Sequence, residues 1–542
     1  MGARIHHVEL TLLILVVLVA LLAVFAQKLK TPYPIILVLG GLVLSFIHGV
    51  PHVSLNPTFV FLVILPPLVF ASSLNTPWNE FRANWAMLLM LALGLVGFTV
   101  AGVAIFARFV IPGFDWKSGA VLGAVLSTTD VIAVAALATR VGLPHSLLSI
   151  IEGESLVNDG TGLLALQFTT AIVVSGTIPS IASGAGNLVW LMLGGIAAGL
   201  LIGWFVSHVD RFLVRKFPDA SELQILVSLV TPYFAYLLGE TAHASGVLAT
   251  LACGLYVGRR SSETLSSRAR LGAHAVWNVI DFLLNGLVFI VIGLQLPTIL
   301  NGIRPDHGKG PLPWPRMLTE AALVFGILVM LRLFWVYPGA YIAQWIRVHI
   351  QKRRGHRPRP RELAVMAWSG MRGVLALAAA LSLPVMTESG ARFPERETII
   401  FLAFSVILLS LVGQGLTLPP LIRRLGISEP EAERRDAVEA RLEMLKFVLR
   451  TLHGIDTSKD EIEARAVDQL VRLYNQRLQG LSQDGDKQDD ARLERKYREL
   501  GAQIRSAQRG ELMRLRQEGR FRESTLRSIE RELDLMELRW GA

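Results

Sequence analysis

Residues 116–140 read WKSGAVLGAVLSTTDVIAVAALATR, an apolar stretch that four polar residues, 127–130, interrupt midway. A helix rises about 1.5 Å per residue, so Asp130, 14 residues beyond Trp116, lies roughly 21 Å along it. A bilayer core is about 30 Å thick, and the carboxylate is therefore expected well inside it. An ionisable group at that depth is costly, so it indicates a functional site.

A second apolar stretch has the same kind of interruption. Residues 361–386 read RELAVMAWSGMRGVLALAAALSLPVM, with SGMRG at 369–373. Counted along the chain, the two stretches are the fifth and twelfth apolar spans, so they cross the membrane in opposite directions. Such a pair is typical of the discontinuous helices of inverted-repeat transporters. We expect Asp130 to neutralise the N-termini of the half-helices there, and Arg372 their C-termini.

A third polar stretch, EGESLVNDG at 152–160, lies in the sixth span. Asp159 comes 15 residues after Pro144, which is again near mid-depth. Ser155 and Asp159 are four residues apart and share one helix face. A hydroxyl one turn from a carboxylate offers oxygen ligands to a small hard cation. This face therefore predicts a cation site.

Three more polar residues extend this pattern. Glu152 lies on the stripe of Asp159, nearer the cytoplasmic end, and is expected to line an entrance; Glu154 and Asn158 share the adjacent stripe. One buried acid–arginine pair could simply hold helices together. Here five ionisable groups lie on three spans, with Ser, Thr and Asn beside them. This number favours a transport site over a purely structural ion pair.

The rest of the chain predicts an all-α polytopic membrane protein with a helical tail. The 542 residues are 52% hydrophobic and 18% charged, but residues 425–542 hold 47 of the charged side chains and residues 1–424 only 49. The first part is too apolar for a soluble domain, and the second is as polar as a solvated helical segment. We therefore predict a transmembrane domain at 1–424 and a cytosolic helical tail at 425–542. The thirteen expected spans are 8–27, 32–49, 57–75, 84–110, 116–140, 146–175, 187–210, 221–239, 243–258, 271–297, 316–346, 361–386 and 396–422.

The basic residues predict an orientation. Of the 30 Lys and Arg in residues 1–424, 20 fall on one side of the predicted membrane and 8 on the other, and a large share of the 20 lies in the run 352–361. Since cytoplasmic loops are enriched in Lys and Arg, the N-terminus is expected outside and the tail in the cytoplasm, with the chain in the inner membrane. Basic loops beside a bilayer account for the net charge of +10 without a nucleic-acid partner.

Other signals are weaker. Gly195, Gly199 and Gly203 form a G-x-x-x-G-x-x-x-G face, which predicts close helix packing. Asp281 and Asn285, four residues apart in the tenth span, could support the site from behind its ligands or serve in packing, and packing is favoured. Arg332 in the eleventh span is expected to snorkel or to pair internally. No Walker A, H-E-x-x-H or G-x-S-x-G pattern occurs in the sequence, so neither an enzyme nor a cofactor is expected.

In the tail, Val438, Leu442, Leu445, Leu449 and Leu452 recur at helical spacing. Residues 482–490 read SQDGDKQDD, with four aspartates and no apolar side chain, and are expected to form a flexible joint.

With these residues in place, the sequence resembles the monovalent cation/proton antiporters of the sodium/proton exchanger type. The resemblance covers about 1–424 and is carried in order by ILPPLVF at 64–70, Thr129-Asp130, GES at 153–155 with Asn158-Asp159, Gly293-Leu294, and GMRG at 370–373. It implies a dimerisation part and a six-helix core that moves to alternate access, usually as a homodimer.

The resemblance also implies roles. Asp159 is similar to the ion-binding carboxylate, Asn158 to its neighbour in the Asn-Asp pair that the family associates with electroneutral exchange, and Ser155 and Thr129 to further ion ligands. By the same likeness, Asp130 and Arg372 stabilise the broken helices, with Glu154 as the partner of Arg372. The implied substrates are protons and sodium or potassium, and the implied role is pH homeostasis.

Two positions depart from the family pattern. Val131 stands where proline commonly follows Thr-Asp, which predicts a milder break in the fifth span. Ala71 stands where many members carry glutamate, so one acidic ligand is missing. This second departure bears on the ion affinity and on the choice between sodium and potassium.

The exchange mechanism rests on competition. A carboxylate away from water is held neutral by either a proton or a cation, and the empty anion is the costly state to move across the membrane. Two rivals stay open: a cation channel regulated by the tail, which needs neither the inverted broken helices nor proton coupling, and a structural or sensory membrane protein whose tail binds a partner.

Overall fold

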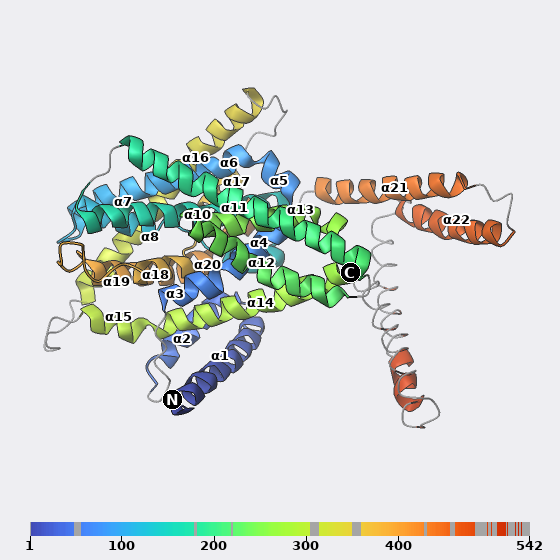
Figure 1. Ribbon diagram of the computed structural model, residues 1–542, viewed down its shortest axis with the longest axis horizontal. Coiled ribbons are helices and arrows are strands. Elements are labelled where there is room, and N and C mark those ends of the chain that lie inside the picture. Colours follow the sequence, from blue (N-terminus) through green and yellow to red (C-terminus); the bar gives the residue numbers. More distant parts are fainter. Residues whose placement is uncertain are drawn as a thin grey trace. The chain divides into compact units, whose positions relative to one another are not determined.

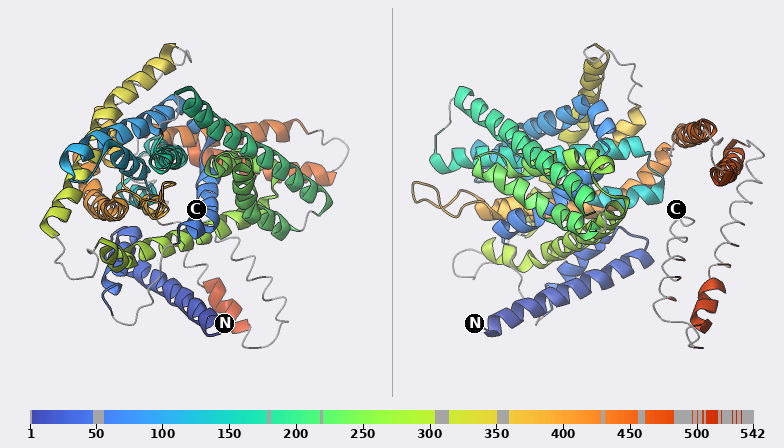
Figure 2. Two further views of the ribbon diagram at one scale, coloured as in Figure 1. Left: turned by 60° about the vertical axis from the view of Figure 1, so that its left-hand side comes forward. Right: turned by 45° about the vertical axis from the view of Figure 1, so that its right-hand side comes forward.

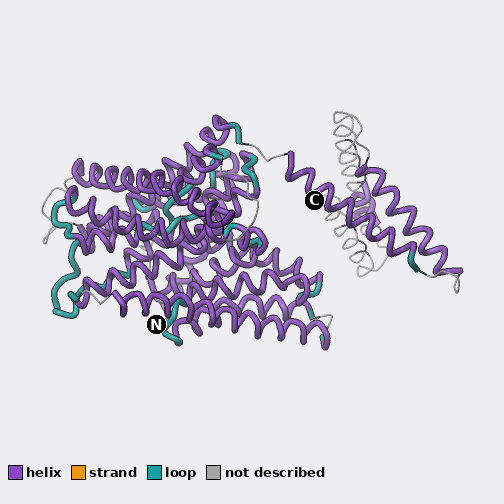
Figure 3. Tube along the Cα trace, turned by 90° about the horizontal axis from the view of Figure 1, so that it is seen from above, coloured by secondary structure: helices purple, strands orange, loops and turns teal. Residues whose placement is uncertain are grey.

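A computed structural model describes residues 2–47, 56–177, 181–217, 220–303, 314–349, 359–427, 431–455, 461–482 and single residues and short stretches between 496 and 533. The chain divides into two compact units, Met1–Glu429 and Pro430–Ala542. The described residues are helices, turns and loops without a strand (Figure 3). The protein is therefore an all-α polytopic membrane protein. The predicted joint at 482–490, and all of the basic run 352–361 except its last three residues, lie outside the described residues.

Figure 1 shows the helices of the first unit. In chain order they are α1 (Gly2–Lys28), α2 (Tyr33–Leu44), α3 (Pro57–Phe59), η1 (Val60–Ile64), α4 (Leu65–Asn75), α5 (Trp78–Ala83), α6 (Trp85–Leu89), η2 (Met90–Leu95), α7 (Val96–Val110), α8 (Trp116–Val125), α9 (Ile132–Val141), α10 (His145–Ser175), α11 (Ile181–Lys216), α12 (Ser221–Thr241), α13 (Gly246–Thr264), α14 (Ser267–Leu294), α15 (Leu296–Ile303), α16 (Trp314–His349), α17 (Pro360–Trp368), α18 (Val374–Leu381), α19 (Arg396–Leu409), η3 (Ser410–Gln414) and α20 (Gly415–Leu425).

Seven helical stretches among the described residues are both long and apolar enough to cross a membrane. They are Pro57–Asn75, Trp85–Val110, Gly186–Lys216, Ser221–Thr241, Ser267–Ile303, Trp314–His349 and Arg396–Leu425. Leu13–Lys28 and Tyr33–Leu44 are shorter apolar helices. The count of thirteen spans stays a prediction.

The fifth and twelfth predicted spans are both broken in the middle. The first is α8 followed by α9, with residues 126–131 between them, and the second is α17 followed by α18, with residues 369–373 between them. The two breaks touch, because the Asp130 amide donates to the Met371 carbonyl at 2.8 Å. The predicted pair of discontinuous helices is therefore present.

The break between α8 and α9 spans residues 126–131 and ends at Val131. The Asp130 carboxylate accepts from the Ile132 amide at 2.8 Å, where α9 begins. That this break is milder than one with a proline after Thr-Asp stays a prediction.

The predicted glycine face does pack closely. It lies on α11, which runs along α13. A Cβ at Gly195 would collide with the Ser245 carbonyl, and one at Gly199 with the Ala249 carbonyl. The glycines thus allow the two backbones to approach, as expected of small residues between membrane helices.

Figure 2 shows the helices of the first unit in two further views. The half-helix α8 packs against α7 and α10, and α18 packs against α19. Buried aliphatic side chains fill this region, among them Leu122, Leu126 and Leu377. Helix α14 packs mainly on α2, α12 and α1, and also touches α18. Its Val288, Phe289 and Ile290 belong to the same hydrophobic core as these leucines.

The second unit begins as a helical hairpin. Helix α21 (Glu431–His453) packs against α22 (Glu461–Ser482). Leu449 and Leu452 are buried, on the stripe that the sequence predicts, whereas Val438 at the start of that stripe is exposed.

Candidate ion-binding site

Asp130 lies between the N-termini of two half-helices. Its Oδ1 accepts from the Ile132 amide, the first residue of α9. A Cβ at Gly373, immediately before α18, would collide with the same carboxylate. A negative charge is favourable beside the partial positive charge of each helix start. Asp130 is thus placed as the sequence predicts.

Arg372 lies at the other pole of the first break. Its Nη1 donates to the carbonyls of Ser127 at 3.2 Å and Thr128 at 3.1 Å, just beyond the C-terminus of α8. Its own amide donates to Ser410 Oγ at 3.0 Å. A cation beside the last carbonyls of a helix is favourable, so this placement also agrees with the prediction.

The predicted pairing of Glu154 with Arg372 is wrong. Glu154 instead accepts two hydrogen bonds from Arg332 on α16, from Nη1 at 2.5 Å and from Nη2 at 2.8 Å. Arg332 also donates to the Met366 carbonyl, in the last turn of α17, at 3.1 Å. Gly370 leaves room for this guanidinium, with which a Cβ would collide. Because Arg332 neutralises Glu154, Arg372 is left to the carbonyls of α8.

Arg332 is therefore the partner of Glu154, a pairing that the sequence did not predict. The available signal was its position, 18 residues into an apolar helix that begins at Trp314. Such a deep arginine requires an internal partner. Several carboxylates were candidates, and spacing along the chain cannot choose between partners on different helices.

Two polar residues of α10 hold this helix against the first break. Ser155 Oγ donates to the Thr129 carbonyl at 2.7 Å, and Asn158 Nδ2 donates to the Ser127 carbonyl at 3.0 Å and to Thr129 Oγ1 at 3.3 Å. Asn158 Oδ1 is buried without a hydrogen-bond partner. The predicted ligands Ser155, Asn158 and Thr129 are thus brought together.

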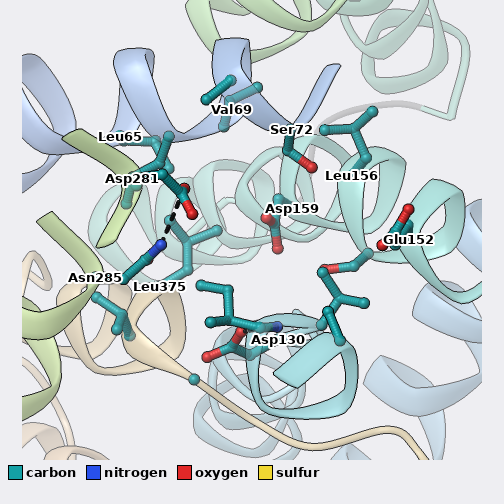
Figure 4. Close-up of a pocket in the computed structure, with 18 of the residues that line it drawn as sticks. Leu65, Val69, Ser72, Asp130, Glu152, Leu156, Asp159, Asp281, Asn285 and Leu375 are labelled. Atoms are coloured by element: carbon teal, nitrogen blue, oxygen red, sulfur yellow. Dashed lines mark hydrogen bonds between the residues drawn. The ribbon is translucent and has the colours of Figure 1, made fainter. Parts of the chain in front are cut away.

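A cavity of about 360 Å³ opens beside these residues. Asp130, Glu152 and Asp159 line it, together with Ser155 and Thr129 (Figure 4). Asp130 Oδ2 and Asp159 Oδ1 are buried and find no hydrogen-bond partner in the described part of the chain. Among the described residues Asp159 takes part in no ion pair. Carboxylate and hydroxyl oxygens converge here on a space that can hold a small cation.

The wall formed by α4 contributes no carboxylate. Ala71, Ser72 and Asn75 line the cavity from this helix. Ala71 is 3% exposed, so its methyl group occupies the place where a longer acidic side chain would enter. The position at which many family members carry glutamate, Ala71 here, therefore lies in the lining of the cavity.

The match to known proteins agrees with this geometry. Residues 14–424 fit the sequence model of the family described as sodium/hydrogen exchanger, transmembrane. The chain belongs to this family. The family resemblance inferred from the sequence is thereby confirmed, and the protein is a membrane-embedded transporter of the cation/proton exchange class.

Relatives of this exchanger cover most of its length. A Na(+)/H(+) exchanger of Mycobacterium bovis, named as uncharacterised, is 33% identical over 97% of this chain and 96% of its own. A protein named sodium, potassium, lithium and rubidium/H(+) antiporter, from Bacillus pumilus, is 32% identical over 86% of this chain and 68% of its own. The solved sodium proton antiporter of Methanocaldococcus jannaschii shares the fold, with a TM-score of 0.62 at 19% identity over 78% of this chain and 99% of that one.

Proposed function

We propose that this exchanger moves one monovalent cation, sodium or potassium, against one proton by alternating access, with Asp159 as the shared binding site. Ser155, Thr129 and Asn158 supply further oxygens around the cation. Asp130, Arg372 and Glu154 keep the broken helices in place, Glu154 through Arg332. Glu152 lines the entrance, which lies on the cytoplasmic side in the orientation that the basic residues predict.

The observation that carries the proposal is the distribution of charges around Asp159. Glu154 is neutralised by Arg332, and Arg372 is engaged by helix carbonyls. Asp130 is engaged by the start of α9. Asp159 has no such partner among the described residues, although it lines a cavity with hydroxyl groups beside it. Its charge is therefore available to a cation or a proton from outside.

Competition at this carboxylate explains coupling. With a cation or a proton bound, Asp159 is neutral and can cross the low-dielectric barrier, whereas the empty carboxylate is costly to move. One carboxylate exchanges one charge for one charge. The neutral Asn158 beside Asp159 adds no second titrating group, which supports electroneutral exchange.

Replacement of Asp159 tests the proposal. We expect Asp159→Asn to abolish cation-dependent pH changes in proteoliposomes, because the amide can be neither charged nor protonated in this range. Asp210→Asn is the matched control: Asp210 is 2% exposed on α11, lies outside the cavity lining, and should retain exchange. Full activity of Asp159→Asn would overturn the assignment.

The rival function is a cation channel regulated by the tail. Voltage-clamped bilayers with the purified protein distinguish the two. Electroneutral exchange predicts no current under a sodium gradient but a pH change inside vesicles, whereas a channel predicts current without proton movement. Steady cation current would overturn the exchange proposal.

We infer the assembly and the topology from the same family. The protein is expected as a homodimer in the inner membrane, with its N-terminus outside and its tail in the cytoplasm. Cysteine labelling from each side of the membrane tests the topology, since the natural Cys253 is completely buried. Mass measurement in lipid nanodiscs tests the dimer.

A further inference from the structure

A second carboxylate–amide pair lines the cavity from α14. Asn285 Nδ2 donates to Asp281 Oδ1 at 3.0 Å, one helical turn apart. Both side chains line the cavity, and Figure 4 shows them beside one another on a different wall from Asp159. The pair lies on α14, whereas Asp159 lies on α10 and Asp130 lies in the break between α8 and α9.

Asn285 has an unmet hydrogen-bonding group. The side chain is 0% exposed, and its Oδ1 is buried without a partner among the described residues. A carboxylate accepts hydrogen bonds, so the amide nitrogen must face Asp281 and the amide oxygen is turned away from it. An unsatisfied buried carbonyl oxygen is destabilising and indicates a missing donor or cation.

The cavity is also unbalanced in charge. Four carboxyl groups line it, those of Asp130, Glu152, Asp159 and Asp281, while no Lys or Arg appears among its described lining residues. Among the described residues Asp281 forms no ion pair. A cavity walled by one sign of charge concentrates the opposite ion, so this one attracts cations.

We propose that Asp281 and Asn285 form a second monovalent-cation site, at which the ion is captured on another wall of the cavity before it reaches Asp159. The Asp281 carboxylate supplies the charge, and the Asn285 amide oxygen supplies a neutral ligand. Such hard oxygen ligands suit sodium and potassium. This inference rests on the proposed exchange at Asp159 and adds a capture step to it.

A capture site has a distinct kinetic signature. Its loss lowers the apparent affinity for the cation, while the rate at saturating cation is set by Asp159 and the movement of the protein. We expect Asp281→Asn to raise the KM for sodium or potassium by about tenfold or more, the range typical when a supporting ligand is lost, and to change the maximal rate little. Asn285→Leu, which removes the oxygen at similar volume, should raise KM in the same direction.

The experiment is sodium- and potassium-driven exchange by the full chain in proteoliposomes, with initial rates measured over a range of cation concentration at fixed pH. Asp281→Glu keeps the charge and should stay within about threefold of the wild-type KM, and Asp210→Asn controls for loss of a buried aspartate outside the cavity. Protein yield and thermal unfolding of each variant are measured in parallel. Should Asp281→Asn fail to fold, Asn285→Leu and Asp281→Glu carry the test.

The outcomes separate the two proposals. Wild-type exchange that Asp159→Asn abolishes, with KM unchanged in Asp281→Asn and Asn285→Leu, would overturn the second site and leave Asp159 in place. A fall in maximal rate at unchanged KM would also overturn it, because that result indicates a structural role. Absence of exchange in the wild type would instead sink the function proposed for Asp159.

Discussion

Glu154 and Arg332 are the most completely buried ion pair among the described residues, with side chains 1% and 3% exposed. Their two parallel hydrogen bonds join α10 to α16, and the contact from Arg332 to the Met366 carbonyl adds α17. The pair thus ties the helix that carries Asp159 to one of the two broken helices. Its value lies in position, because a buried ion pair contributes little net stability compared with well-packed apolar residues.

At this scale the pairing is testable by a double-mutant cycle. Glu154→Leu or Arg332→Met alone leaves one buried charge without its partner, which is expected to destabilise the protein by about 3–5 kcal/mol and to lower Tm in detergent. The double variant that combines Glu154→Leu with Arg332→Met should recover much of that loss. An equal coupling in a second cycle, of Glu154→Leu with Arg372→Met, would contradict the structure.

The half-helices are the elements on which the site depends. Each break leaves helix ends inside the first unit, where their partial charges need partners. Asp130 lies beside the N-termini of α9 and α18. Arg372 binds carbonyls beyond the C-terminus of α8, and Arg332 binds a carbonyl in the last turn of α17. This arrangement fixes Thr129 and Ser127, to which α10 is bonded, and therefore the wall of the cavity beside Asp159.

A glycine at the second break tests this view. Gly373 has an extended backbone, but a Cβ there would collide with the Asp130 carboxylate. We expect Gly373→Ala to displace that carboxylate and to reduce exchange at least tenfold. Gly326→Ala on α16 is the matched control, since a Cβ there meets nothing within 4 Å. Unchanged exchange in Gly373→Ala would argue that the contact with Asp130 is dispensable.

For the whole molecule, the proposed sharing of Asp159 between proton and cation predicts a pH dependence. As the pH falls, protons occupy the carboxylate and the apparent KM for the cation rises, approaching tenfold per pH unit where protonation dominates. The maximal rate should fall less than the affinity. Exchange measured from pH 6 to 9 at several sodium concentrations tests this, and a KM independent of pH would argue for separate proton and cation sites.

The division into two units yields a second prediction at this scale. Every residue of the proposed site lies in Met1–Glu429. A chain ending at Glu429 is therefore expected to insert and to exchange cations for protons, with KM within about twofold of the full chain. A truncated protein that inserts but does not exchange would assign the second unit an essential part in transport.

The sequence by itself determined the all-helical membrane fold, the two broken spans and the group of polar residues around Asp159. These follow from local rules. The length of an apolar stretch indicates a membrane span, and an ionisable residue inside such a stretch is costly unless it has a function or a partner. The same rules located Asp130 and Arg372 at the breaks. Spacing along α10 also placed Ser155 and Asp159 on one face.

Only the tertiary structure decided which charged side chains pair with one another. Arg332 lies in α16 and Arg372 in the break between α17 and α18, and the sequence offers no measure of which one faces Glu154. The structure also turned Asp281 and Asn285, expected to be packing residues, toward the cavity of Asp159. The physical reason is that contacts between helices depend on how each helix is rotated about its axis, and the packing of all its neighbours sets that rotation together.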